Sequence, residues 1–181
     1  MRLALLRHQD SPGDATRGVD VEVAWAGPGR LRLTYVVRGD IMALRLPEVG
    51  PHVRADDLWR HTCFEMFIRT DNAVGYHEFN ISPSGAWAAY VFDGYRSGIR
   101  NEDVAAPTTA RGVEAGVFRL DVEIELPATL SRQQPWNLAL TAVIEETAGA
   151  MSYWALAHPP GRADFHHADG FSFRVTPAER A

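Results

Sequence analysis

Apolar and polar residues alternate along much of this chain, and this period of two is the feature that most constrains its fold. The run VFRLDVEIEL (117–126) places five apolar residues, from Phe118 to Leu126, on one side of an extended segment and four charged residues on the other. The run GRLRLTYVV (29–37) has a similar pattern. Successive side chains of a strand point to opposite faces, so each run predicts a half-buried strand. Such strands are typical of antiparallel sheets.

Seven further segments have the composition of strands: VDVEVAW (19–25), RHTCFEMFI (60–68), YHEFNIS (76–82), AWAAYVF (86–92), WNLALTAVI (136–144), SYWAL (152–156) and FSFRV (171–175). Turn residues such as AGPG, RGD and SPSG separate them. The segments DVAAPTTARG (103–112) and PATLSRQQPW (127–136) are interpreted as loops. About nine or ten strands with little helix predict one all-β domain over residues 1–181, an antiparallel β-sandwich or barrel.

The segment YHEFNISPSGAWAAYVF (76–92) predicts a hairpin with a defined register. Pro83 and Gly85 in SPSG fit a three-residue loop that ends in a glycine bulge. The resulting register pairs Ser82 with Ala86, Asn80 with Ala88, Glu78 with Tyr90, and Tyr76 with Phe92. One face then carries Phe79, Ile81, Trp87, Ala89 and Val91, and the other carries Tyr76, Glu78, Asn80, Ser82 and Tyr90. A slip of one residue would mix apolar and polar side chains, so the pattern supports this register.

The strand before this hairpin places more polar groups on the same face. If Phe64, Met66 and Ile68 point to the core, Glu65 and His61 lie with Glu78 and Asn80. This face is either a solvated outer surface or a binding surface. Large aromatic residues such as Tyr90 favour binding, because aromatic rings stack on the apolar faces of sugars while carboxylates and amides bond to hydroxyl groups.

Charge and composition exclude several functions. The net charge is −5, no basic block is present, and all 18 basic residues are arginine. Nucleic acid and anionic membranes are therefore poor candidate partners, and lysine-dependent chemistry is excluded. The single cysteine, Cys63, allows no internal disulfide, and no apolar stretch is long enough to span a membrane. We expect a cytoplasmic protein without a visible signal peptide. The sequence does not define an oligomeric state.

Three segments together resemble bacterial DOMON-like proteins, which are related to the family-9 carbohydrate-binding modules: DDLWRHTCFEMFI (56–68), YHEFNISPSGAWAAYVFDGYR (76–96) and YWALAHPPGRADFHHADGF (153–171). The resemblance covers about residues 55–100 and 150–175. It implies an immunoglobulin-like or jelly-roll sandwich whose sheet face binds a sugar or haem. It implies that Glu65 has the ligand-binding role seen in the sugar-binding relatives, and it suggests the same role for Glu78 and Asn80. Haem-binding relatives use a methionine with a histidine or lysine, and lysine is absent, so we expect no cofactor.

Three loops supply further candidate residues. In DDLWRH (56–61), Trp59 and Arg60 could form the rim of a pocket, or Trp59 could simply cover the edge of the core. In FDGYRSGIRNED (92–103), Arg96 could meet a ligand from a mobile loop, or the segment could be an ordinary turn.

The third loop, GRADFHHADGF (161–171), contains Asp164, His166 and His167. Adjacent side chains diverge in an extended segment, so we expect one histidine to face inward and the other to face solvent. No HxH, HxxxH or HExxH spacing is present, so the metal signal is weak. The alternatives are that Asp164 and one histidine tie the loop to the sheet or contact a ligand.

The sequence therefore predicts a non-catalytic module that binds a sugar-like or other small polyhydroxy ligand. Its candidate residues are Trp59, Arg60, His61, Glu65, Glu78, Asn80, Tyr90, Arg96, Asp164, His166 and His167. One alternative is a small glycosidase-type hydrolase that uses Glu65 with Glu78, or His166 with Asp164. Another is a haem- or metal-binding domain.

Overall fold

A computed structural model describes residues 1–71, 73–130 and 134–176. The strands are β1 (Arg2–Arg7), β2 (Thr16–Gly27), β3 (Arg30–Gly39), β4 (Cys63–Thr70), β5 (Tyr76–Ile81), β6 (Trp87–Phe92), β7 (Arg100–Asn101), β8 (Thr108–Glu114), β9 (Val117–Glu125), β10 (Trp136–Glu145), β11 (Met151–Ala155) and β12 (Phe173–Val175). Three short 3₁₀ helices, η1 (Ile41–Ala43), η2 (Leu58–Arg60) and η3 (Ala168–Gly170), are the helices of the described residues.

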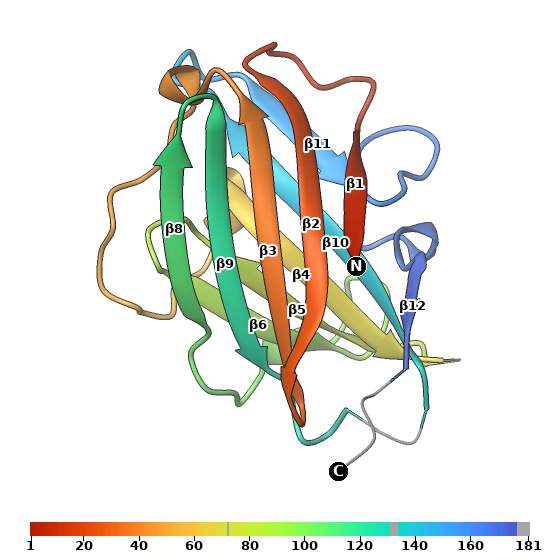
Figure 1. Ribbon diagram of the computed structural model, residues 1–181. Coiled ribbons are helices and arrows are strands. Elements are labelled where there is room, and N and C mark those ends of the chain that lie inside the picture. Colours follow the sequence, from red (N-terminus) through yellow and green to blue (C-terminus); the bar gives the residue numbers. More distant parts are fainter. Residues whose placement is uncertain (72, 131–133, 177–181) are drawn as a thin grey trace.

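The strands form one continuous antiparallel sheet that curls back on itself (Figure 1). Its order is β7-β6-β5-β4-β10-β11-β1-β2-β3-β9-β8, with β12 beside β10. In Figure 1, β1, β2, β3, β9 and β8 form one layer and β10, β4, β5 and β6 lie behind it. Strand β1 joins the two halves because it pairs with β2 and also with β11.

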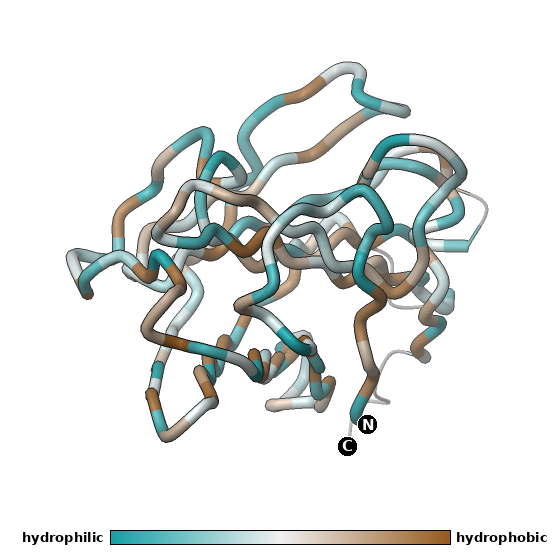
Figure 2. The backbone as a smooth tube through the Cα atoms, turned by 90° about the horizontal axis from the view of Figure 1, so that it is seen from above, coloured by the Kyte–Doolittle hydropathy of each residue, from teal (hydrophilic) through white to brown (hydrophobic). Residues whose placement is uncertain are grey.

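The main core lies between the two halves of the sheet. Tyr35 and Phe118 come from the first half and Phe64 and Phe79 from the second, and all four are fully buried. The rings of Phe64 and Phe118 stack with centroids 6.0 Å apart, which joins the two layers directly. Along the tube in Figure 2, hydrophobic and hydrophilic residues follow each other in short steps, as the period of a half-buried strand requires.

A second apolar cluster covers the opposite face of β4 and β5. The segment between β11 and β12, residues 156–172, folds over this face and is called the covering loop below. Its Phe171 packs with Phe67 of β4, Tyr76 of β5 and Phe92 of β6. Strand β4 is therefore buried on both faces from residue 63 to residue 68, although its sequence alternates. The sequence pattern left open whether this face of β4 and β5 is solvated, and the covering loop buries part of it.

The all-β antiparallel fold with little helix is confirmed, and so is the hairpin register. Strands β5 and β6 pair Tyr76 with Phe92, Glu78 with Tyr90 and Asn80 with Ala88, and Gly85 has a φ of +96°.

The expected count of nine or ten strands was wrong, because the described residues form twelve. Where a sandwich was expected, the structure has one continuous curled sheet. Residues 108–112 belong to the edge strand β8, where the sequence had predicted a loop. Strand β8 is largely exposed, so its sequence has no apolar alternation. Part of the second predicted loop, residues 131–133, lies outside the described residues.

Candidate ligand-binding site

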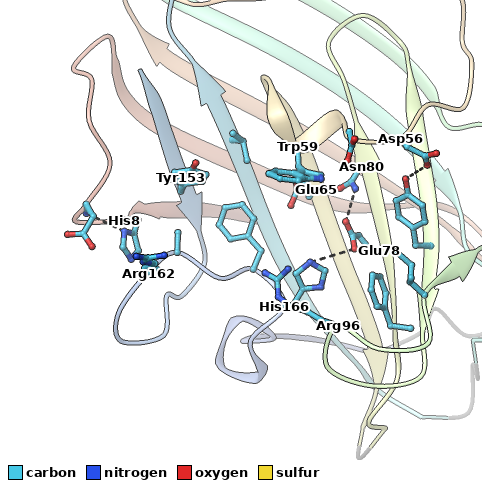
Figure 3. Close-up of a pocket in the computed structure, with 18 residues that line it drawn as sticks. His8, Asp56, Trp59, Glu65, Glu78, Asn80, Arg96, Tyr153, Arg162 and His166 are labelled. Atoms are coloured by element: carbon cyan, nitrogen blue, oxygen red, sulfur yellow. Dashed lines mark hydrogen bonds and ion pairs between the residues drawn. The ribbon is translucent and has the colours of Figure 1, made fainter. Parts of the chain in front are cut away.

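A pocket of about 750 Å³ opens on the face of β4 and β5 that carries their polar side chains (Figure 3). Strands β4, β5 and β6 supply its floor, and η2, the β6–β7 loop and the covering loop supply its walls. Its volume lies within the roughly 300–1,000 Å³ that small-molecule sites occupy. The covering loop packs against β4 and β5 at one end, and the pocket lies beyond it, over Glu65 and Asn80.

Glu65, Glu78 and Asn80 form the polar floor of the pocket. Strand pairing sets Glu65 of β4 opposite Asn80 of β5, and Glu78 follows two residues away on the same face. The exposed fractions of the three residues are only 2%, 6% and 2%. The Asn80 amide donates to Glu78 Oε1 at 2.7 Å, and the Thr141 hydroxyl donates to Glu65 Oε2 at 3.1 Å. Asn80 Oδ1 is buried without a hydrogen-bond partner, although buried polar atoms almost always have one.

Burial changes the protonation of both carboxyl groups. Loss of solvent, and then the negative charge of Glu78, raises the pKa of Glu65 to about 8. Loss of solvent also raises the pKa of Glu78 to about 7, although the bond from Asn80 favours its charged form. Near neutral pH the floor therefore holds protons that exposed glutamates would have lost.

His166 is the histidine of the covering loop that faces the floor. Its Nδ1 lies 2.7 Å from the Tyr76 hydroxyl, and its Nε2 lies 4.0 Å from Glu78 Oε2. Burial lowers the pKa of His166 to about 4, with the Arg96 charge acting in the same direction, so the ring is neutral. The Tyr76 oxygen accepts the Arg96 backbone N–H, so we assign its own proton to His166 Nδ1 and the ring proton to Nε2, toward Glu78.

Asp164 connects the two loops that border the pocket. Its carboxylate accepts from the Tyr95 hydroxyl at 2.6 Å and from the Arg96 guanidinium at 2.8 Å, and it also accepts the backbone N–H of His166. Partial burial opposes the charge, but these bonds hold the pKa of Asp164 below its usual value. Asp164 thus contacts His166 through the backbone, and Tyr76 rather than Asp164 contacts the imidazole ring.

Aromatic side chains surround the mouth of the pocket. Trp59 of η2 is 52% exposed and lies beside Glu65 in Figure 3. The Tyr90 hydroxyl donates to Asp56 at 2.5 Å, which fixes the ring at the side of the pocket. Tyr153 of β11 lies in the opposite wall. The mouth therefore offers flat apolar surfaces above a polar floor.

Two of the lining residues have strained backbones. Asp57 (φ +60°) and Arg96 (φ +50°) are the non-glycine residues with positive φ in the described part of the chain, and both line the pocket. Such conformations are costly for residues with a Cβ and cluster at functional sites.

Seven of the eleven candidate residues line the pocket: Trp59, Glu65, Glu78, Asn80, Tyr90, Arg96 and His166. Asp164 does not line the pocket itself, but it holds the guanidinium of Arg96, which does. The other three point elsewhere. The Arg60 guanidinium lies over the Trp59 ring, 5.4 Å from its centroid, and His61 Nδ1 contacts Glu145 at 2.8 Å. His167 is half-buried outside the pocket, and its Nδ1 accepts the Asp169 backbone N–H.

The far wall of the pocket contains residues that the sequence did not suggest. His8 and Asp10 follow β1, and Arg162 lies in the covering loop. His8 Nε2 donates to the Gly161 carbonyl at 2.9 Å, while its Nδ1 accepts the Asp10 N–H. These residues are about 150 positions apart, and no local pattern signals their contact. The pairing of β1 with β11 brings them together.

The described residues lack two kinds of feature. No group of three or more His, Cys, Asp or Glu side chains there is arranged to hold a metal ion. In the same part of the chain, no helix has the length and apolar character needed to cross a membrane.

Comparisons with known proteins identify relatives in structure only. No family model and no curated protein matches the sequence. A Bacteroides uniformis protein, provisionally assigned as carbohydrate-binding, superposes with a TM-score of 0.67 at 14% identity, over 95% of this chain and 84% of its own. A family-9 carbohydrate-binding module from Caldicellulosiruptor kristjanssonii in complex with glucose gives 0.57 at 9% identity, over 94% and 81%. A family-9 module from the same organism with cellotriose gives 0.51 at 10% identity, over 83% and 70%. The predicted likeness to the family-9 fold is therefore confirmed, as a likeness of fold.

Proposed function

We propose that this chain is a non-catalytic binding module that holds a sugar-like or other small polyhydroxy ligand in the pocket above β4 and β5. The observation that carries the proposal is Asn80 Oδ1, a buried acceptor without a partner on the pocket floor. Leaving such an atom unpaired costs about 1–3 kcal/mol, and a ligand hydroxyl that donates to it would recover this cost. The proposal involves no cofactor.

The walls suit the apolar part of the same ligand. A sugar ring has a face of C–H groups that stacks on aromatic rings, and its edge carries hydroxyl groups. Trp59 stands at the mouth with half of its surface free, and Tyr90 and Tyr153 line the sides. The floor and walls therefore match the two kinds of surface that a sugar presents.

The structural relatives support the same ligand class. The two family-9 modules are in complex with glucose and with cellotriose. The motifs at about residues 55–100 and 150–175 resemble DOMON-like proteins, and we infer that this chain is a DOMON-like relative of those modules.

Titration calorimetry with glucose, cellotriose and a panel of other monosaccharides tests the proposal. Asn80→Ala should weaken binding at least about tenfold, because the orphaned acceptor is lost. Asn101→Ala, which removes an exposed asparagine of β7, should leave binding unchanged. Trp59→Ala changes a half-exposed residue, so it should reduce affinity without unfolding the protein. The proposal is wrong if no sugar binds, or if both pocket variants bind as well as the wild type.

Hydrolysis is a second candidate because Glu65 and Glu78 have raised pKa values in one pocket. A glycosidase needs one carboxylic acid that is still protonated near neutral pH and a second carboxyl group close by. Turnover of aryl glycosides that is lost in both Glu65→Gln and Glu78→Gln would establish it. Absence of turnover with intact binding leaves the binding module as the function.

A further inference from the structure

The floor of the pocket contains two carboxyl groups with little positive charge to balance them. Glu65 and Glu78 lie on neighbouring strands and are almost completely buried. The Arg96 charge acts on both carboxyls, but its guanidinium bonds to the Asp164 carboxylate at 2.8 Å. Arg162 lies toward the opposite side of the pocket in Figure 3. Burying charges without partners is costly in free energy, so the two carboxylates are poorly stabilised when both are ionised.

The other groups around the two carboxyls do not supply the missing charge. Among the described residues, the groups that interact with them include six titratable or charged side chains: Tyr35, Cys63, Tyr76, Tyr90, Arg96 and His166. Burial raises the pKa values of the three tyrosines and of Cys63, and it lowers the pKa of His166 to about 4. Of these six groups, only Arg96 is charged at neutral pH.

The donors of the floor are already in use. The Asn80 amide nitrogen donates to Glu78, and the Thr141 hydroxyl donates to Glu65. Once both carboxyls are ionised, these residues offer the pocket only acceptors: the two carboxylates and the unpartnered Asn80 Oδ1. A group with several donors and a positive charge would complete this set. An ammonium group has three donors and no acceptor.

We propose that the ligand is an amino sugar whose ammonium group binds between Glu65, Glu78 and Asn80 Oδ1. This inference rests on the proposed function, since the hydroxyl groups and ring of the same ligand use the aromatic walls. The only chemical change is proton transfer. The carboxylic acids that are protonated in the empty pocket release their protons to the solvent when the ammonium group arrives. A neutral sugar leaves those protons in place, because a carboxylic acid both donates to and accepts from hydroxyl groups.

Calorimetry with matched pairs of sugars separates the two cases. Glucosamine is compared with glucose and N-acetylglucosamine, and galactosamine with galactose, at about pH 6.5, below the raised pKa values of both carboxyls. Titration in two buffers of different ionisation enthalpy counts the protons released. The amino sugar should bind at least about tenfold more tightly than its neutral partners, with release of about one proton or more per ligand.

Variants identify the groups responsible. Glu65→Gln and Glu78→Gln keep the shape of the side chains, and each should reduce both the preference for the amino sugar and the proton count. Glu114→Gln removes an exposed carboxylate from β8 and should change neither quantity. Urea unfolding of each variant confirms that it is folded.

The outcomes distinguish the two proposals. Equal binding of amino and neutral sugars without proton release would overturn the amino-sugar inference and leave the sugar-binding function intact. Binding of none of these sugars would overturn both. A preference for the amino sugar that persists in Glu65→Gln and Glu78→Gln would place the ammonium group elsewhere and refute the assigned site.

Discussion

Replacing Glu65 by glutamine should stabilise the ligand-free protein at alkaline pH. The pKa of Glu65 is about 8 in the folded protein, mainly because of burial, against 4.5 for an ordinary glutamate. Between these pH values the folded state binds more protons at this site than the unfolded state does. The free energy of unfolding therefore falls as the pH rises from about 4.5 to about 8, and it levels off above that. Glutamine cannot ionise and avoids this loss.

The gain in stability of Glu65→Gln can be calculated from the difference between the two pKa values of Glu65. At ~1.4 kcal/mol for each pKa unit, the difference between 4.5 and about 8 corresponds to about 5 kcal/mol. This is an upper limit, because water in the pocket and small movements of side chains lower the cost of the buried charge. We expect Glu65→Gln to be about 2–5 kcal/mol more stable than the wild type at about pH 9, and nearly equal at about pH 5. The glutamine oxygen can still accept the Thr141 hydroxyl.

Urea unfolding at about pH 5 and about pH 9 measures this difference. Glu114→Gln is the matched control, since Glu114 is an exposed glutamate in β8 and its replacement should change stability by less than about 0.5 kcal/mol at either pH. Equal stability of Glu65→Gln and the wild type at about pH 9 would show that the folded protein does not penalise the Glu65 carboxylate. The pKa of Glu65 would then not be raised by burial in the folded protein.

Three further predictions concern the framework of the site. Asp164→Asn should cost about 1 kcal/mol at neutral pH. The cost should shrink in acid, because the stabilising charged form of Asp164 is lost as the pH falls through its lowered pKa; thermal unfolding at about pH 7 and about pH 3 checks this. Gly39→Ala should cost about 2 kcal/mol or more in urea unfolding, because the new Cβ would lie 1.9 Å from a backbone oxygen, whereas Gly112→Ala meets nothing within 4 Å and should be nearly neutral. Tyr76→Phe removes the hydroxyl that bonds to His166, so calorimetry should show several-fold weaker sugar binding in a folded protein.

The register of the β5–β6 hairpin could be predicted because its determinants are local. The SPSG turn requires a positive φ at Gly85, and the alternation of residues 76–92 allows only one register that separates apolar from polar side chains. The same reasoning placed Glu65 on the face of Glu78 and Asn80, and the β4–β5 pairing agrees.

Strands β1, β7 and β8 were not predicted, for different reasons. Strand β7 has only two residues, which are too few to show a pattern. Strand β8 is an exposed edge whose pairing with β9 supplies its hydrogen bonds without an apolar face. Strand β1 has a short run of consecutive apolar residues instead of an alternating pattern. Its role as the link between the two halves depends on partners about 15 and about 150 residues away. Long-range pairing leaves little mark on a local pattern.

The sequence by itself determined which side chains share a face of the sheet, because the period of two is a property of the extended backbone. Only the tertiary structure decided that the face with Glu65 and Glu78 is buried, since the covering loop closes over it from a distant part of the chain. The same contact turns His166 toward Glu78, while His167 lies outside the pocket beside Asp169. Burial by a distant segment, rather than the residues of the strands alone, makes this polar face a candidate binding site.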